Sequence, residues 1–153
     1  MIEVGRKAPA FTLPSSDGGT VSLKDLSGKK VVLFFYPKDN TPGCTLEACD
    51  FRDNFSRIQA AGALVFGVSG DGIASHEKFR DRFSLPFPLL SDESHEMMAS
   101  YGVWKEKTNY GRTYLGIERT TVLIDGDGIV RRIWPKVTVK GHVDAVLAAL
   151  TEE

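Results

Sequence analysis

The fold is decided by the stretch VVLFFYPKDNTPGC, residues 31–44. Its first six residues are apolar and rich in β-branched and aromatic side chains, which predicts a strand buried on both faces of a sheet. Residues 37–40 break that strand. Thr41 and Pro42 then suit the N-cap and the first position of a helix. We predict this helix over residues 41–61, with Gly62 as its stop.

The rest of the chain alternates strands and helices in the same way. Residues 11–13 and 20–23 flank a turn-rich segment and predict a small N-terminal β-hairpin. A second hairpin is predicted around Asp-Gly-Asp-Gly at 125–128, with strands at 120–124 and 129–134. Further strands are expected at 63–68 and 87–90, and further helices at 75–83, 94–101 and 143–150. This order predicts an α/β protein with a mixed central β-sheet flanked by helices.

Length and composition limit the classes of function that the chain can have. A chain of 153 residues with 42% hydrophobic and 25% charged residues fits a single globular domain over residues 1–153. Its net charge of −1 argues against nucleic acid or an anionic membrane surface as a partner. No segment approaches the roughly 18 apolar residues of a membrane helix, and the first residues lack a signal-peptide pattern. We therefore expect a cytoplasmic protein with no membrane partner.

The chain has two cysteines, Cys44 and Cys49, and in a reducing compartment such a pair favours catalytic, redox or metal-binding roles over a structural one. Cys44 falls in the first turn of the predicted helix. Free backbone N–H groups and the positive end of the helix dipole stabilise a thiolate there. Gly43, which has no side chain, leaves the sulfur open to an approaching molecule.

Cys49 follows five residues later in the same predicted helix. Residues at that spacing have Cα atoms about 8–9 Å apart on different sides of a helix, whereas a disulfide needs Cα atoms within ~7 Å. If the two cysteines pair, the first helical turns must therefore unwind. The alternative is that Cys49 is an ordinary buried helix residue.

A metal site or a phosphate loop is less favoured. Two cysteines supply half of a tetrahedral zinc site. His76, His95 and His142 show no ligand spacing, and we expect them at the surface or at helix ends. Residues 69–72, Ser-Gly-Asp-Gly, lack a phosphate-loop pattern and are interpreted as a turn. We expect neither a metal nor a cofactor.

Residues 35–45, FYPKDNTPGCT, closely resemble the active-site segment of peroxiredoxins, in which proline, threonine and cysteine stand at the spacing of Pro37, Thr41 and Cys44. Residues 45–52, TLEACDFR, resemble the Q-type branch, also called bacterioferritin comigratory proteins, as an atypical two-cysteine member. Residues 101–107 and 116–125 resemble later family segments. The second of these aligns Arg119 with the active-site arginine, although Arg112 lies nearby. The family implies a thioredoxin-like fold, one natural solution for this element order.

The resemblance implies a thiol peroxidase acting on hydrogen peroxide and organic hydroperoxides in antioxidant defence. Cys44 would be the peroxidatic cysteine that becomes a sulfenic acid. Thr41, the Gly43 backbone and Arg119 would bind the peroxide, and Pro37 would shield the sulfur.

The family also implies how the sulfenic acid is removed. Cys49 would resolve it as an intramolecular disulfide, and thioredoxin or a similar dithiol reductant would restore the thiols. A monomer suffices for this cycle. Glu47 recurs in Q-type members, and its role, structural or catalytic, stays open.

Two other functions compete with this interpretation. A thiol–disulfide oxidoreductase would share the fold, but the C-x-x-C motif of such enzymes is absent from the sequence. A redox sensor would use the unwinding of the helix to change partners. The sensor would be oxidised by peroxide and recycled slowly, so its turnover number would separate it from a peroxidase.

Overall fold

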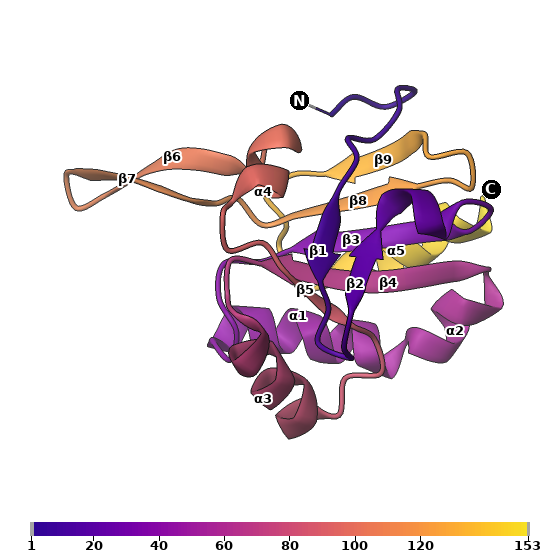
Figure 1. The fold of residues 1–153 in the computed structure, drawn as a ribbon, viewed down its shortest axis with the longest axis horizontal. Helices are drawn as coiled ribbons and strands as arrows, with labels where there is room; N and C mark the ends of the chain where they lie inside the picture. The colour runs from indigo at the N-terminus through magenta and orange to yellow at the C-terminus, as the bar shows by residue number, and fades with distance from the viewer. Residues whose placement is uncertain (1, 153) are drawn as a thin grey trace.

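The computed structural model describes residues 2–152 and is built around a five-stranded mixed sheet in the order β5-β4-β3-β8-β9 (Figure 1). The central strand β3 (Lys30–Phe35) pairs parallel with β4 (Ala63–Ser69), which pairs parallel with β5 (Leu89–Ser91). On its other side β3 pairs antiparallel with β8 (Thr120–Ile124), which continues antiparallel into β9 (Val130–Trp134). The predicted α/β class and mixed sheet are confirmed.

The strand β3 is buried on both faces, as its sequence predicts. Val32 and Phe34 pack into one apolar cluster, while Val31, Leu33 and Phe35 pack into a second cluster on the opposite face. The five side chains are at most 1% exposed. This double burial explains why the strand has no polar alternation.

Helices cover both faces of the sheet. The first face carries α1 (Pro42–Asp53), α2 (Phe55–Ala60) and α5 (His142–Thr151), which contact one another. α3 (Ile73–Phe83) packs near β5, and α4 (Glu96–Ser100) contributes to the second cluster. The predicted N-terminal hairpin is confirmed as β1 (Thr12–Pro14) and β2 (Thr20–Ser22), followed by the short 3-10 helix η1 (Leu23–Leu26).

The prediction of one helix over residues 41–61 is wrong, because the helix breaks at Asn54. This residue has φ −111° and ψ 10° and separates α1 from α2. Its side-chain amide donates a hydrogen bond of 2.8 Å to the carbonyl of Asp50. Asparagine side chains compete in this way with the backbone ladder of a helix, and α1 therefore ends at Asp53.

A hairpin that the sequence analysis did not anticipate extends away from the body of the molecule (Figure 1). It consists of β6 (Trp104–Asn109) and β7 (Arg112–Ile117), paired antiparallel. The chain returns along β7 to the body of the molecule and enters β8 shortly afterwards. Among the described residues, no helix has the length and apolar character that crossing a membrane requires.

Candidate active site

The carboxyl end of β3 leads through residues 37–40 into α1. Asn40 has a left-handed φ of 61°, a conformation that asparagine tolerates better than most residues. Thr41 is extended at the N-cap position, and the first intrahelical hydrogen bond runs from Thr45 N–H to its carbonyl. The amides of Gly43 and Cys44 precede this bond, and they are therefore directed out of the helix start.

Arg119 bridges the thiol and a buried carboxylate. The Cys44 side chain is 1% exposed, and Arg119 Nη2 donates to its sulfur at 3.3 Å. Arg119 Nη1 donates to Glu47 Oε1 at 2.7 Å. The nearby Arg112 is exposed on β7. The geometry therefore brings Arg119, and not Arg112, to the cysteine.

Glu47 lies one helical turn beyond Cys44 and is fully buried. Burial raises the pKa of its carboxyl group from 4.5 to about 7, against the lowering effect of Arg119. Within the described part of the chain, Glu47 Oε2 has no hydrogen-bond partner. Burial alone would lower the pKa of Arg119, but the charges of Glu47 and Cys44 raise it overall. The pair thus keeps a guanidinium cation beside the sulfur.

The Thr41 side chain does not cap α1, contrary to the simplest expectation for a threonine at this position. Its hydroxyl instead donates a hydrogen bond of 2.8 Å to the carbonyl of Lys38. Because the hydroxyl proton is used in this way, the oxygen presents its lone pairs to a bound molecule.

The second thiol lies on the same continuous helix. Cys44 and Cys49 are both free, and Cys49 is partly exposed. Burial raises the pKa of the Cys49 thiol, Arg52 lowers it, and Asp53 and Asp50 raise it. Cys49 is therefore predominantly a thiol in the intact helix.

Pro37 is exposed and stands beside the hairpin β6–β7. It lines a cavity of about 360 Å³ together with Trp104, Tyr114 and Leu115 of the hairpin. The cavity therefore opens between the loop before α1 and this hairpin.

Comparison with known proteins identifies the family. Residues 4–133 match the AhpC/TSA family. The chain is 48% identical over 151 residues to Peroxiredoxin Bcp of Bacillus subtilis, covering 99% of this chain and 96% of that protein. It superimposes with a TM-score of 0.92 on a solved structure of the bacterioferritin comigratory protein of Xanthomonas campestris, at 41% identity and 98% coverage of both chains.

The chain is a peroxiredoxin of the AhpC/TSA family. Its relatives named Bcp also include that of Escherichia coli, 42% identical over 151 residues, which is 99% of this chain and 97% of the relative. The resemblance to the Q-type branch and the thioredoxin-like fold are both confirmed. Membership in this family implies thiol peroxidase activity.

The structure corrects the expectation for one histidine of this peroxiredoxin, His76, which lies inside α3 and not at the surface or at a helix end, whereas His142 begins α5. His76 is fully buried, and its Nδ1 lies 2.7 Å from Asp39 Oδ2. His142 is also buried, at 2.7 Å from the Thr121 hydroxyl, and burial together with Arg119 lowers its pKa to about 4. His95 stands at the N-cap position of α4, as expected of a residue at a helix end.

Several polar residues near the peroxiredoxin site were missed by sequence reasoning. Asp39 of the loop 37–40 lies close to Asp71 and His76, and the ligand-type atoms of the three residues lie within 4.8 Å of one another. The sequence places Asp39 and Asp71 each shortly after a predicted strand, but it does not specify that the two strands are parallel neighbours. The carboxyl ends of such strands meet at one edge of the sheet.

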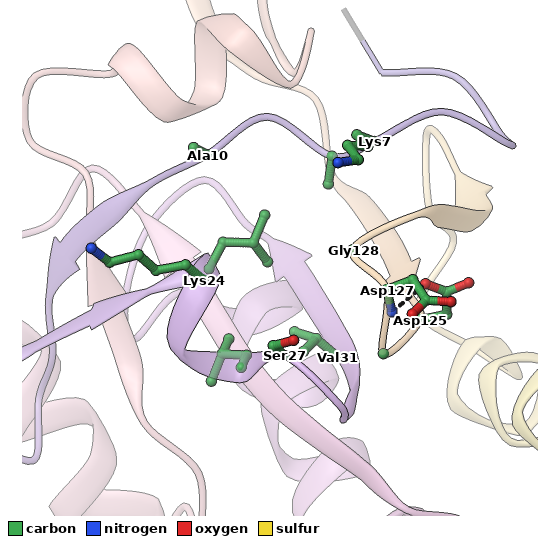
Figure 2. A pocket seen from close by; sticks show the side chains of 12 residues that line it. Lys7, Ala10, Lys24, Ser27, Val31, Asp125, Asp127 and Gly128 are labelled. Carbon is green, nitrogen blue, oxygen red and sulfur yellow. Dashed lines mark hydrogen bonds between the residues drawn. The ribbon is translucent and has the colours of Figure 1, made fainter.

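A cavity of about 400 Å³ lies at the other end of the sheet, where β3 begins and β8 ends (Figure 2). Its wall is formed by the N-terminal segment with Lys7 and Ala10, by η1 and by the turn that contains Asp125 and Gly128. Its lining includes neither cysteine, nor Thr41, nor Arg119. The cavity is therefore separate from the candidate active site.

Proposed function

We propose that this peroxiredoxin reduces hydrogen peroxide and organic hydroperoxides through Cys44. The observation that carries the proposal is the contact of Arg119 with both the Cys44 sulfur and the buried Glu47. The thiolate attacks the terminal peroxide oxygen and the O–O bond breaks. The sulfur becomes a sulfenic acid, and the departing oxygen takes a proton and leaves as water or an alcohol.

The surrounding groups have complementary roles in this step. The Thr41 oxygen accepts a hydrogen bond from the peroxide, and the amides of Gly43 and Cys44 donate to it. Arg119 favours the thiolate and stabilises the charge that moves along the breaking O–O bond. Pro37 limits the access of water to the sulfenic acid.

Cys49 then attacks the sulfenic sulfur, which releases water and leaves a Cys44–Cys49 disulfide. The first turns of α1 must unwind for this bond to form, since both cysteines lie within one continuous helix. The second half of the helix is better anchored, because Phe51 is fully buried and stacks on Phe34 with ring centroids 4.7 Å apart. Unwinding therefore starts at the more exposed first turn.

Thioredoxin or a similar dithiol reductant reduces this disulfide, and the chain completes the cycle as a single-domain monomer in antioxidant defence. The Xanthomonas relative provides support for organic hydroperoxides as substrates, because its structure was described in a study of its alkyl peroxide reduction activity.

The decisive experiment measures intact mass and free thiols of the reduced protein after one equivalent of hydrogen peroxide. Loss of both thiols and of two hydrogens, with the chain still monomeric, supports the proposed disulfide. Repeated turnover with thioredoxin then separates a peroxidase from a redox sensor. Two intact thiols would contradict the proposed chemistry.

A further inference from the structure

The peptide bond between Lys38 and Asp39 is held from both of its polar ends. Its carbonyl accepts the Thr41 hydroxyl at 2.8 Å. Its N–H donates to Asp71 Oδ2, also at 2.8 Å. A peptide unit is planar, and its C=O and N–H point in opposite directions. The Asp71 carboxylate therefore fixes the direction in which the Lys38 carbonyl meets Thr41.

Asp71 is itself fixed by its own neighbours. The Ser69 hydroxyl donates to Asp71 Oδ2 at 2.7 Å, and the Ser91 hydroxyl donates to the Asp71 carbonyl at 2.6 Å. Both serines are buried at the carboxyl ends of β4 and β5. The carboxylate is therefore attached to the rigid sheet and not to α1, which has to unwind during the proposed cycle.

The Asp39 side chain forms a second anchor for the same peptide. Its carboxylate receives hydrogen bonds from the Tyr36 hydroxyl at 2.6 Å and from the Ser75 hydroxyl at 2.8 Å. Its third neighbour is His76 Nδ1, while His76 Nε2 lies 2.9 Å from the Leu90 carbonyl. A carbonyl only accepts, so Nε2 carries a proton. The loop is thus tied to α3 and β5 as well.

A metal site is the obvious alternative for this cluster of two carboxylates and a histidine. However, the clustered Asp39, Asp71 and His76 atoms are already engaged in the hydrogen bonds described above. A metal ion would have to displace several of these donors. The hydrogen-bond pattern therefore favours a positioning network.

We propose that Asp71 is a positioning residue for peroxide reduction, acting through the Lys38–Asp39 peptide to orient the Thr41 hydroxyl. A charged acceptor on the N–H polarises the peptide and strengthens its carbonyl as an acceptor. The Thr41 hydroxyl then donates its proton to the Lys38 carbonyl, and the lone pairs of the Thr41 oxygen stay directed at the peroxide. This inference rests on the proposed function of Thr41.

The test is a double-mutant cycle on the rate at which the reduced protein consumes hydrogen peroxide. Asp71→Ala should lower the second-order rate constant about tenfold, the equivalent of about 1.4 kcal/mol. In a Thr41→Val background, Asp71→Ala should have no further effect, because the hydroxyl that it orients is gone. Asp71→Asn, which keeps an acceptor oxygen, should restore most of the rate.

Asp125→Ala is the matched control. Asp125 also accepts backbone N–H groups, those of Asp127 and Ile129, but it does so in the β8–β9 turn at the other end of the sheet. Its replacement should leave the peroxide rate unchanged. If Asp71→Ala does not fold, Ser69→Ala removes one donor to Asp71 and should lower the rate about threefold by the same Thr41-dependent route.

Two results would overturn the inference while leaving the proposed function intact. One is an active wild-type protein whose rate is unchanged by Asp71→Ala, or by Ser69→Ala where that variant replaces it. The other is a rate constant that Asp71→Ala lowers by the same factor with and without the Thr41 hydroxyl, which indicates a general structural effect. A wild-type protein that does not consume peroxide at all would instead contradict the proposed function.

Discussion

The buried Glu47 and the partly buried Arg119 form an ion pair in which Oε1 and Nη1 are 2.7 Å apart. The second carboxylate oxygen is buried without a hydrogen-bond partner in the described structure. Only one of the two carboxylate oxygens of Glu47 is therefore hydrogen-bonded. Burying the ionised carboxylate costs solvation free energy that this single bond recovers only in part. The same ion pair orients the Arg119 guanidinium, whose other nitrogen donates to the Cys44 sulfur.

The first prediction concerns the pH dependence of stability. The pKa of Glu47 is about 7 in the folded protein and near 4.5 once the chain unfolds, so the folded state binds more protons between these values. The contribution of Glu47 to stability is therefore largest below pH 4.5 and is lost as the pH rises to about 7. The difference amounts to about 3 kcal/mol at most.

Urea unfolding at pH 5 and pH 8 checks this prediction against Glu47→Gln, which cannot titrate. Relative to that variant, the wild-type protein should lose free energy of unfolding as the pH rises. Glu106→Gln changes an exposed residue of β6 and should keep the wild-type pH dependence. Parallel pH profiles for the wild type and Glu47→Gln would show that Glu47 does not titrate in this range.

The second prediction concerns Gly43→Ala. A Cβ atom at this position would lie 3.3 Å from Arg119 Nη2, so the guanidinium that contacts the sulfur must move by a few tenths of an ångström. Alanine favours a helix over glycine by about 1 kcal/mol, and the melting temperature should hold or rise. Peroxide reduction should fall about tenfold, since small displacements of catalytic groups are costly. An unchanged rate would mean that the contact is not needed for the reaction.

The third prediction concerns the geometry of the guanidinium. Arg119→Lys keeps the charge, but a single ammonium group cannot reproduce the fork that reaches Glu47 Oε1 and Cys44 Sγ together. We expect about a hundredfold loss in the rate constant with hydrogen peroxide. Arg112→Lys, on the exposed strand β7, is the matched control and should react at the wild-type rate. Equal rates for the two variants would remove Arg119 from the mechanism.

Much of this fold was predictable because its strongest patterns are local. The run from Val31 to Tyr36 needs no partner information to be recognised as a doubly buried strand, and the Asp125–Gly128 turn specifies its hairpin. The break at Asn54 was missed because it depends on one side chain competing for the Asp50 carbonyl. The hairpin β6–β7 was missed because most of its length is exposed and β6 after Trp104 is entirely polar.

The candidate site was predictable only in part, for a related reason. The positions of Thr41 and Cys44 follow from local helix-start chemistry. The contact between Arg119 and Glu47 joins residues far apart in sequence, and their spacing carries no signal of it. Asp71 likewise meets the loop 37–40 only because β3 and β4 are parallel neighbours. Such contacts depend on strand order, which the sequence pattern did not specify.

The last prediction separates the two thiols. Cys44→Ser should abolish peroxide consumption, because a serine hydroxyl stays protonated and is a poor nucleophile. Cys49→Ser should consume about one peroxide per chain and then stall with thioredoxin, since its sulfenic acid has no partner thiol within the chain. Mass spectrometry should find one added oxygen in the Cys49→Ser protein and none in Cys44→Ser. Retained turnover in Cys44→Ser would contradict the mechanism, whereas full turnover in Cys49→Ser would assign resolution to a thiol from another molecule.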